Sequence, residues 1–236
     1  MNTSIPIFIG YDTRERAATN VLIDSLYQKS STPLAITPIV LNNLKSNGMY
    51  WRERDSKQST DFSFSRFLVP MLMNYQGWAI FMDCDMLCRD DITKLWDQRD
   101  ETKALMCVKH NHIPNETSKF LGEVQSKYQK KNWSSLMMFN CSRCLSLTLD
   151  YVNNASGLEL HQFKWLENDN DIGAITGYWN YLVDVDKTID STKNKEVPPL
   201  VHWTLGGPWF YDFKTNDSDL SDEWFESRSN AFNIAD

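Results

Sequence analysis

The chain has 236 residues and is 42% hydrophobic, which is enough for one sizeable α/β domain with a buried core. With 24 Lys and Arg against 31 Asp and Glu, its formal net charge is −7. This charge gives no general attraction to a nucleic-acid backbone, and no apolar run approaches the roughly 20 residues of a membrane helix. The sequence therefore argues against a nucleic-acid partner and against a transmembrane segment.

The start of the chain lacks the basic region and long apolar run of a signal peptide. The cysteines are odd in number and lie mostly in apolar segments, which disfavours a disulfide framework and fits a reducing compartment. They are Cys84, Cys88, Cys107, Cys141 and Cys144. We expect a cytoplasmic protein, and the sequence leaves its oligomeric state open.

The first 41 residues predict a strand, a helix and a second strand. Residues 5–9 form a short apolar run that ends at Gly10, and residues 14–27 carry apolar side chains at helical spacing, with Asp12 or Thr13 as the cap. Residues 34–41 read as a strand that Pro38 assigns to an edge or a bend. This order is the βαβ unit of a nucleotide-binding fold.

The middle of the chain predicts a helical run over residues 63–75, which Pro70 kinks or restarts, and then a buried strand over residues 78–82. Further elements follow in chain order. We expect short helices at 91–96 and 145–152, strands at 104–108, 135–139, 181–185 and 200–203, and a peripheral acidic tail with one helix after residue 210.

Asp83 and Asp85 stand directly after the buried strand, separated by Cys84. Burying two unpaired carboxylates costs several kcal/mol, so this pair needs a cation. In an extended chain both carboxylates point to one side and Cys84 to the other, so both can hold one hard ion such as Mg²⁺ or Mn²⁺. Such an ion can bridge the diphosphate of a nucleotide sugar.

An apolar strand followed by Asp-x-Asp also opens haloacid-dehalogenase-like phosphatases, where the first Asp is the nucleophile. That motif usually lies near the N-terminus, whereas here a complete βαβ unit precedes it and Met86 and Leu87 follow. The phosphatase remains the alternative. A third possibility is a nucleotide-sugar-binding protein without turnover.

Several segments in a fixed order resemble the family of glycogenin and the lipopolysaccharide galactosyltransferases, family 8 of the glycosyltransferases. They are residues 65–72 (SRFLVPML), 79–87 (AIFMDCDML), 91–95 (DITKL), 132–140 (NWSSLMMFN) and 202–209 (HWTLGGPW). With the turn at residues 10–12, the similarity covers most of residues 5–210. The sequence at residues 133–135 and 172–174 is also similar to that of bacterial and viral glycosyltransferase-like proteins, which indicates a divergent branch of the family.

The resemblance implies a GT-A fold, a Rossmann-like α/β architecture with a mixed central sheet flanked by helices. We expect a single domain over residues 1–236, with a nucleotide-binding half (1–100), an acceptor half (101–210) and a peripheral tail (211–236). The implied activity is transfer of a sugar from a UDP-sugar to a glycan or other hydroxyl acceptor, with retention of configuration.

The resemblance also implies roles for individual residues. The metal, Mn²⁺ before Mg²⁺ because a histidine takes part, is expected on Asp83, Asp85 and His202. The nucleotide sugar is expected to contact Gly10, Tyr11, Asp12, Ser63, Arg66, Asp83, Cys84, Gly206, Gly207 and Trp209. The donor or acceptor sugar is expected near Asn132, Trp133, Ser134 and Ser135.

The sequence departs from the family pattern at two places. The lysine that holds the diphosphate is replaced by Gly207, so the amides of Gly206 and Gly207, or Lys109, would have to take its place. The family's acidic catalytic motif is matched at best by Asp169 and Asp171, and an inverting enzyme with Asp171 as base stays open.

Two other groups of metal-binding residue types are not assigned to a metal. Cys141 and Cys144 have no second pair of ligands at suitable spacing for zinc, so we expect them to be structural. His110 and His112 follow the strand at 104–108, where acceptor contact or simple surface exposure are both compatible with the sequence.

Overall fold

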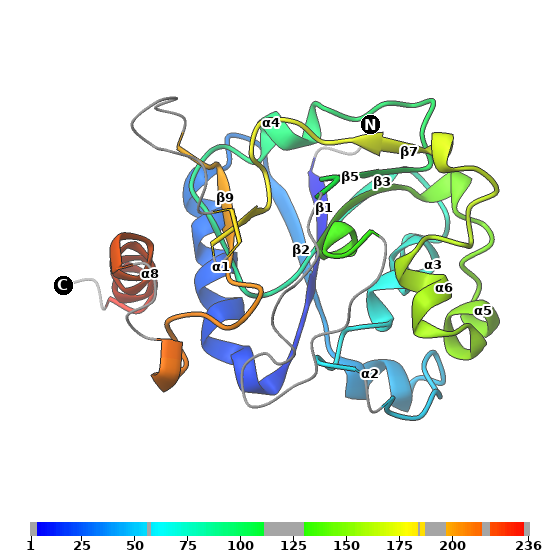
Figure 1. Ribbon diagram of the computed structural model, residues 1–236, viewed down its shortest axis with the longest axis horizontal. Helices are drawn as coiled ribbons and strands as arrows, with labels where there is room; N and C mark the ends of the chain where they lie inside the picture. The colour runs from blue at the N-terminus through cyan, green and yellow to red at the C-terminus, as the bar shows by residue number, and fades with distance from the viewer. Residues whose placement is uncertain are drawn as a thin grey trace.

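The computed structural model describes residues 4–55, 58–110, 130–183, 185–186, 197–213 and 218–233. Within these residues, a six-stranded mixed sheet has the order β2-β1-β3-β6-β5-β7, and a smaller sheet has the order β4-β9-β8 (Figure 1). The α/β class and the mixed central sheet predicted from the sequence are confirmed. No helix among the described residues is long and apolar enough to cross a membrane.

The strands of the large sheet are β1 (Ile5–Gly10), β2 (Leu34–Ile39), β3 (Trp78–Met82), β5 (Leu105–Cys107), β6 (Leu136–Asn140) and β7 (Ile172–Ala174). Those of the small sheet are β4 (Met86–Cys88), β8 (Tyr181–Leu182) and β9 (Leu200–His202). The α-helices are α1 (Arg16–Lys29), α2 (Leu41–Ser46), α3 (Val69–Leu72), α4 (Thr93–Trp96), α5 (Leu149–Asn154), α6 (Gly157–His161) and α8 (Ser218–Ala231).

The N-terminal part of the sheet is the predicted βαβ unit. β1 pairs in parallel with β2 on one side and β3 on the other, and all of its residues are buried. β2 is the edge strand and its residues are mostly exposed or half-buried, which is where a strand tolerates Pro38. Asp12 caps the first helical turn by accepting a hydrogen bond from the backbone N–H of Arg14.

The helical run expected over residues 63–75 is divided in two. A 3₁₀ helix covers Ser65–Leu68, and α3 restarts at Val69 with Pro70 in its first turn. Proline fits there because its missing N–H has no partner in a first turn. The division turns Arg66 inward, where it is 5% exposed.

β3 joins the parallel and antiparallel parts of the sheet. It is parallel to β1 but antiparallel to β6, and all five of its residues are buried. The carboxyl ends of β1 and β3 therefore lie beside the start of β6, and Asp83 N–H donates to the carbonyl of Ser135 at 2.9 Å. This edge collects the residues that follow β3 and precede β6.

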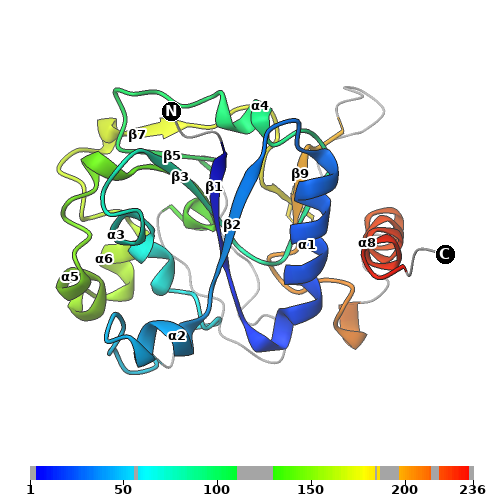
Figure 2. The same cartoon turned by 180° about the vertical axis from the view of Figure 1, so that it is seen from behind.

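Helices cover the sheet from two sides. α1 and α8 pack together on one side, whereas α3, α5 and α6 gather on the other side in both views (Figures 1 and 2). The last helix is less peripheral than the sequence suggested. Trp224 of α8 is 1% exposed and packs in a cluster with Val21 of α1, Val201 of β9 and Trp203.

Candidate active site

Three predicted metal ligands come together at the carboxyl end of β3. Asp83 and Asp85 lie between β3 and β4, and His202 ends β9. The pairing of β4 with β9 places Met86 opposite His202, and Trp203 N–H donates to the carbonyl of Asp85 at 3.0 Å. One ligand atom from each of the three side chains lies within 4.8 Å of the others. Two carboxylate oxygens and one imidazole nitrogen form a donor set that suits a divalent cation such as Mn²⁺.

The tautomer of His202 is fixed by Asn180, a residue that the sequence analysis did not identify. Asn180 Oδ1 accepts a hydrogen bond from Nδ1 of His202 at 2.8 Å. The hydroxyl of Ser135 donates to a carbonyl, so its oxygen accepts from Nδ2 of Asn180, at 2.9 Å, and this fixes the orientation of the amide. In the neutral imidazole, Nε2 is then the nitrogen with the lone pair, and it lies 3.2 Å from Asp85 Oδ1.

Asn180 also connects the metal group to the loop after β5. Its Nδ2 lies 3.0 Å from Nε2 of His110, so both amide hydrogens have acceptors. Asn180 is fully buried and has a φ of 65°, a left-handed conformation that Asn tolerates better than most residues. His110 is thus part of the support of the site, while His112 lies outside the described residues.

Arg66 is the buried partner of Asp83. Its Nη1 lies 2.7 Å from Asp83 Oδ1 and donates to the carbonyl of Ser134 at 2.8 Å. The guanidinium also lies over the rings of Phe62 and Phe81, at 5.2 and 5.0 Å from their centroids. The family resemblance implies a contact of Arg66 with the diphosphate, whereas in this structure Arg66 Nη1 contacts a candidate metal ligand, Asp83.

A cleft with a cavity volume of about 260 Å³ opens above this group. Eight of the sequence-predicted site residues line it, among them all three candidate metal ligands. They are Ser63, Arg66, Asp83, Asp85, Asn132, Ser134, Ser135 and His202. Lining residues that the sequence analysis did not select include Asp55, Gln58, Ser59, Thr60, Lys131, His161 and Thr204.

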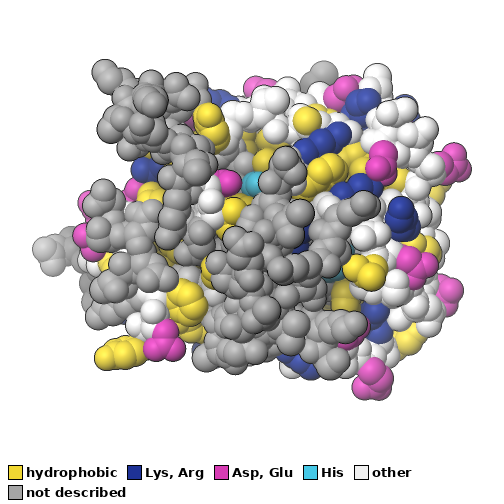
Figure 3. Space-filling view, viewed as in Figure 1, with side chains coloured by type: hydrophobic (Ala, Val, Ile, Leu, Met, Phe, Trp, Pro, Cys, Tyr) yellow, Lys and Arg dark blue, Asp and Glu magenta, His cyan; other side chains and the backbone are white. Residues whose placement is uncertain are grey.

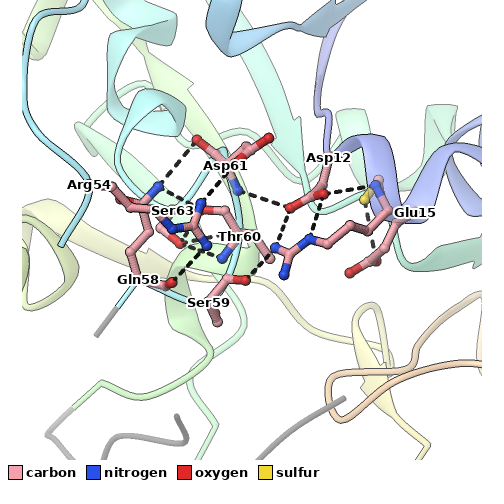
Figure 4. A network of polar contacts seen from close by, with 10 residues as sticks. Asp12, Glu15, Arg54, Gln58, Ser59, Thr60, Asp61 and Ser63 are labelled. Atoms are coloured by element: carbon pink, nitrogen blue, oxygen red, sulfur yellow. Dashed lines mark hydrogen bonds and ion pairs between the residues drawn. The ribbon is translucent and has the colours of Figure 1, made fainter. Parts of the chain in front are cut away.

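The predicted nucleotide contacts at the end of β1 are absent from the lining of this cleft. Phe62 packs against Gly10 so closely that a Cβ there would lie 2.3 Å from its ring, and Tyr11 is half-buried. Asp12 is 1% exposed and accepts hydrogen bonds from Arg14 and from the backbone N–H of Asp61 (Figure 4). These residues hold the loop 58–63 in place.

Arg14 completes the Asp12 network, which we define as Asp12, Arg14, Ser59 and Asp61. It donates to the carbonyl of Ser59 at 2.7 Å as well as to Asp12 (Figure 4). Burial alone would raise the pKa of Asp12, but the hydrogen bonds from Arg14 and Asp61 outweigh it and bring that pKa below its ordinary value. Asp12 is therefore a charged anchor of the fold in this structure.

Cys84 points away from the cleft, as the alternation of the chain predicts. Its thiol is fully buried and donates to Glu15 Oε2 at 3.6 Å, so only its backbone could reach a nucleotide. Glu15 is itself a buried carboxyl that the sequence analysis did not find. Burial, followed by the negative charges of Asp85 and Asp12, holds the pKa of Glu15 well above its ordinary value.

The C-terminal motif divides between the cleft and an aromatic cluster. His202 and Thr204 line the cleft. Gly206 N–H donates to the carbonyl of Trp203 in a turn, and a Cβ at Gly207 would lie 2.2 Å from the ring of Trp209. Trp209 itself packs between Trp203 and Trp224 with centroid separations of 5.9 and 5.4 Å. Glycine is thus required at position 207 by Trp209.

Asp169 and Asp171 lie at the opposite end of the sheet from the metal group. They precede β7, whose first residue, Ile172, pairs with Leu105 of β5. Leu105 pairs with Phe139 of β6, which pairs with Ala79 of β3, so Ile172 is aligned with a residue near the start of β3. At about 3.3 Å per residue and 4.8 Å per strand, this is roughly 20 Å from Asp83. The structure does not bring these carboxylates to the cleft.

Lysines near β7 are engaged at this same distant edge. Lys103 and Lys109 donate to the carbonyls of Asn170 and Ile172, and Lys130 contacts Asp169 at 2.6 Å. Basic side chains gather on this part of the face in Figure 3. Trp133, whose indole donates to the carbonyl of His110, lies beside Lys109 and does not line the cleft. Lys109 is therefore not placed to replace the lysine missing at position 207.

The comparisons with known proteins agree with this architecture. The model of Glycosyl transferase family 8 matches residues 15–145. Protein CDI of Arabidopsis thaliana is 46% identical over 220 residues, which cover 92% of this chain and 83% of that protein.

Solved glycosyltransferases share the fold at low sequence identity. The galactosyltransferase LgtC, in complex with donor and acceptor sugar analogs, has a TM-score of 0.59 at 10% identity and matches over 98% of both chains. GlyE of Streptococcus pneumoniae TIGR4 has a TM-score of 0.62 at 14% identity, and the bifunctional WbbM has 0.64 at 15%. The match covers 96% and 98% of this chain but only 60% of GlyE and 50% of WbbM.

The fold is the GT-A fold of the glycosyltransferases, with a candidate metal group of two aspartates and a histidine at the carboxyl end of the central strands. The match over more than half of the chain, together with the plant relative, identifies the family. The chain belongs to glycosyl transferase family 8.

Proposed function

We propose that this chain transfers a sugar from a UDP-sugar to a hydroxyl group of a glycan or a related acceptor, with the help of Mn²⁺. The observation that carries the proposal is the convergence of Asp83, Asp85 and His202 on one point of the cleft floor. A divalent cation bound there supplies charge that stabilises the departing diphosphate.

The residues around this point would prepare it for a cation and a sugar. Arg66 orients Asp83, and Asn180 presents the lone pair of His202. Asn132, Ser134 and Ser135 form the wall beside Asp83, so we assign them to the donor sugar. Arg66, Ser63 and the backbone of Cys84 remain candidates for nucleotide contacts.

We also propose that the reaction retains the configuration of the donor sugar. An inverting enzyme needs a carboxylate or another base that is free to take the acceptor proton. Among the described residues that line the cleft, the candidate bases outside the metal group are Asp55 and His161, and Nδ1 of His161 is engaged by the hydroxyl of Ser134. Proton NMR of the first product formed would show the same anomer as the donor, and the opposite anomer would overturn this assignment.

The proposal is tested by nucleotide binding and turnover with Asp85→Asn. A thermal-shift screen of UDP-, GDP- and dTDP-sugars with and without Mn²⁺ should select UDP-sugars with Mn²⁺. Asp85→Asn should weaken Mn²⁺-dependent UDP binding by more than about 100-fold, since losses of supporting residues alone reach 10- to 100-fold. Asp90→Asn is the matched control, because Asp90 pairs with Lys94 on the surface.

The alternatives give different results in the same experiments. A phosphatase would hydrolyse a phosphomonoester and be trapped by beryllofluoride on Asp83, and a binding protein would bind UDP with Mn²⁺ without releasing UDP from any donor. UDP affinity unchanged by Asp85→Asn would exclude the proposed metal group.

We propose a reducing compartment such as the cytoplasm, because all five cysteines are free.

A further inference from the structure

One loop forms the part of the cleft next to the end of β1. Its residues Asp55, Gln58, Ser59, Thr60 and Ser63 line the cleft. None of these side chains is basic, and Asp55 carries a carboxyl group. A phosphate group is bound best by cationic donors, so this part of the cleft suits an uncharged part of a nucleotide sugar.

Contacts with the end of β1 hold this loop in place. The backbone N–H of Asp61 donates to Asp12 Oδ2 at 3.1 Å, and Arg14 donates to the carbonyl of Ser59 at 2.7 Å (Figure 4). β2 pairs with β1 on one side and β3 pairs with it on the other, so the strand order reverses at β1. In open α/β sheets, nucleotides bind outside the carboxyl ends of the strands at such a point.

Gln58 is buried in this loop and presents an acceptor whose identity is fixed. It is 4% exposed, and its Nε2 donates to the carbonyl of Thr60 at 2.7 Å and lies 3.5 Å from the carbonyl of Asp61. Both carbonyls can only accept, so they determine which end of the amide is the nitrogen. Oε1, the other end, is buried and has no hydrogen-bond partner within the described part of the chain. An N–H or O–H of a ligand would satisfy it.

Asn132 is a second buried amide in the cleft, with the opposite hydrogen-bonding requirement. It is 8% exposed, and among the described residues its Nδ2 has no acceptor. Asn132 precedes β6, whereas the loop with Gln58 is bound to the end of β1, and β3 with Asp83 after it lies between these two strands. A nucleotide sugar that reaches the metal through its diphosphate has its base on one side of the metal and its sugar on the other. Since Asn132 is assigned to the sugar, Gln58 lies on the side of the base.

Uracil has the donor that Gln58 requires. Its Watson–Crick edge carries one N–H, at N3, between two carbonyl oxygens, whereas cytosine has a lone pair at N3. An amide oxygen that accepts from N3–H therefore distinguishes uracil from cytosine, which are otherwise similar in shape. Hydrogen bonds to ribose hydroxyls cannot make this distinction, because both nucleotides carry the same ribose.

We propose that Oε1 of Gln58 accepts a hydrogen bond from N3–H of the uracil base and gives the site its preference for uridine nucleotides. The inference rests on the proposed function and adds a residue that determines its donor specificity. The residues at the end of β1, which the family resemblance assigns to the nucleotide, then act through the loop that they hold.

The test compares Gln58→Met with Gln98→Met by calorimetry with UDP and CDP in the presence of Mn²⁺. The wild type should bind UDP on the order of 10- to 100-fold more tightly than CDP, because CDP leaves the buried Oε1 without a donor. Gln58→Met should lose this preference, with UDP and CDP affinities within about threefold of each other. Gln98→Met should keep it, since Gln98 is engaged by Thr176 and does not line the cleft.

Two results would overturn the assignment of Gln58. One is equal affinity of the wild type for UDP and CDP, and the other is an unchanged ratio of the two affinities in Gln58→Met, which would indicate that Gln58 only supports the loop. If Gln58→Met does not fold, N3-methyl-UDP tests the same contact in the wild type. It should bind at least about 10-fold more weakly than UDP, and an affinity equal to that of UDP would overturn the proposal. Failure of the wild type to bind any of these nucleotides with Mn²⁺ would instead refute the proposed function.

Discussion

The loop 58–63 separates two polar clusters, one whose central carboxylate has hydrogen-bond partners for both oxygens and one that contains buried polar atoms without partners. On one side lies the Asp12 network, in which both carboxylate oxygens of Asp12 accept hydrogen bonds (Figure 4). On the other side lies the cleft, where Gln58 Oε1 and Asn132 Nδ2 are buried without hydrogen-bond partners. A cluster whose polar groups hydrogen-bond to one another needs no ligand, whereas buried donors and acceptors without partners can be satisfied by a ligand.

This difference separates two kinds of charged residue that look alike in the sequence. Asp12 and Asp83 both follow a buried strand of the βαβ unit. Asp12 is tied to residues near it in the fold, while Asp83 faces a cleft with two further candidate ligands. We therefore expect changes in the first cluster to affect stability and changes in the second to affect binding.

Asp12→Ala should show the largest effect, on stability. It removes the acceptor of Arg14 and of the Asp61 N–H, so the free energy of unfolding should fall by roughly 2–4 kcal/mol in urea titrations. Asp61→Ala is the control, because Asp61 joins the network through its backbone N–H, which alanine keeps, and its exposed side-chain pair with Arg54 contributes only about 0–1 kcal/mol. Equal losses in the two variants would contradict the anchoring role of Asp12.

The lowered pKa of Asp12 predicts a pH dependence of this effect. Its ionised form is favoured in the folded protein, so its contribution is present above its ordinary pKa of 3.8 and is lost as pH falls through the lower folded value. Wild type and Asp12→Ala should therefore converge in stability on acidification below about pH 4. A constant difference down to pH 2 would show that the charge of Asp12 does not matter.

Asn180→Gly should come second, with an effect on metal binding. Glycine tolerates the φ of 65° at this position, so the change removes the contact with His202 without adding strain. Mn²⁺ affinity measured by calorimetry should fall about 10- to 100-fold, the usual cost of losing the partner of a metal-bound histidine. Asn154→Gly, at an exposed helix end, should leave the affinity unchanged, and unchanged affinity in Asn180→Gly would remove His202 from the metal group.

Glu15→Gln should have the smallest effect, visible mainly as a change in pH dependence. The raised pKa means that the folded protein keeps a proton that the unfolded chain releases above about pH 4.5, so wild-type stability falls as pH rises from there. Glutamine removes this titration, and the stability curve of the variant should be flatter. Glu226→Gln, an exposed change on α8, should follow the wild type, and parallel curves for Glu15→Gln would contradict the burial argument.

The sequence predicted the elements that have a regular spacing of apolar residues, and the charged residues that directly follow such an element. The strands at β1 and β3, the helix α1 and the edge position of β2 follow from apolar periodicity and from Pro38. Asp83 and Asp85 stand out because charge follows directly after a buried run. Short elements such as β4 and β7, with three residues each, were missed because partner strands and not local patterns define them.

The rest of the site depends on how the strands pair and on single residues that belong to no sequence motif. Asp169 and Asp171 matched a motif by spacing, but the pairing of β7 with β5 places them at the far end of the sheet. Asn180 and Lys131 belong to no recognisable motif in the sequence, and only the fold brings them to His202 and to the cleft.

The aromatic cluster at the C-terminal end gives the protein an optical label. The ring of Trp209 contacts those of Trp203 and Trp224, and Trp203 directly follows His202. Indole rings fixed at such separations produce near-ultraviolet circular dichroism, which disappears when side-chain packing is lost. Docking of α8 on β9 can therefore be followed spectroscopically, without any added dye, at the residue next to a candidate metal ligand.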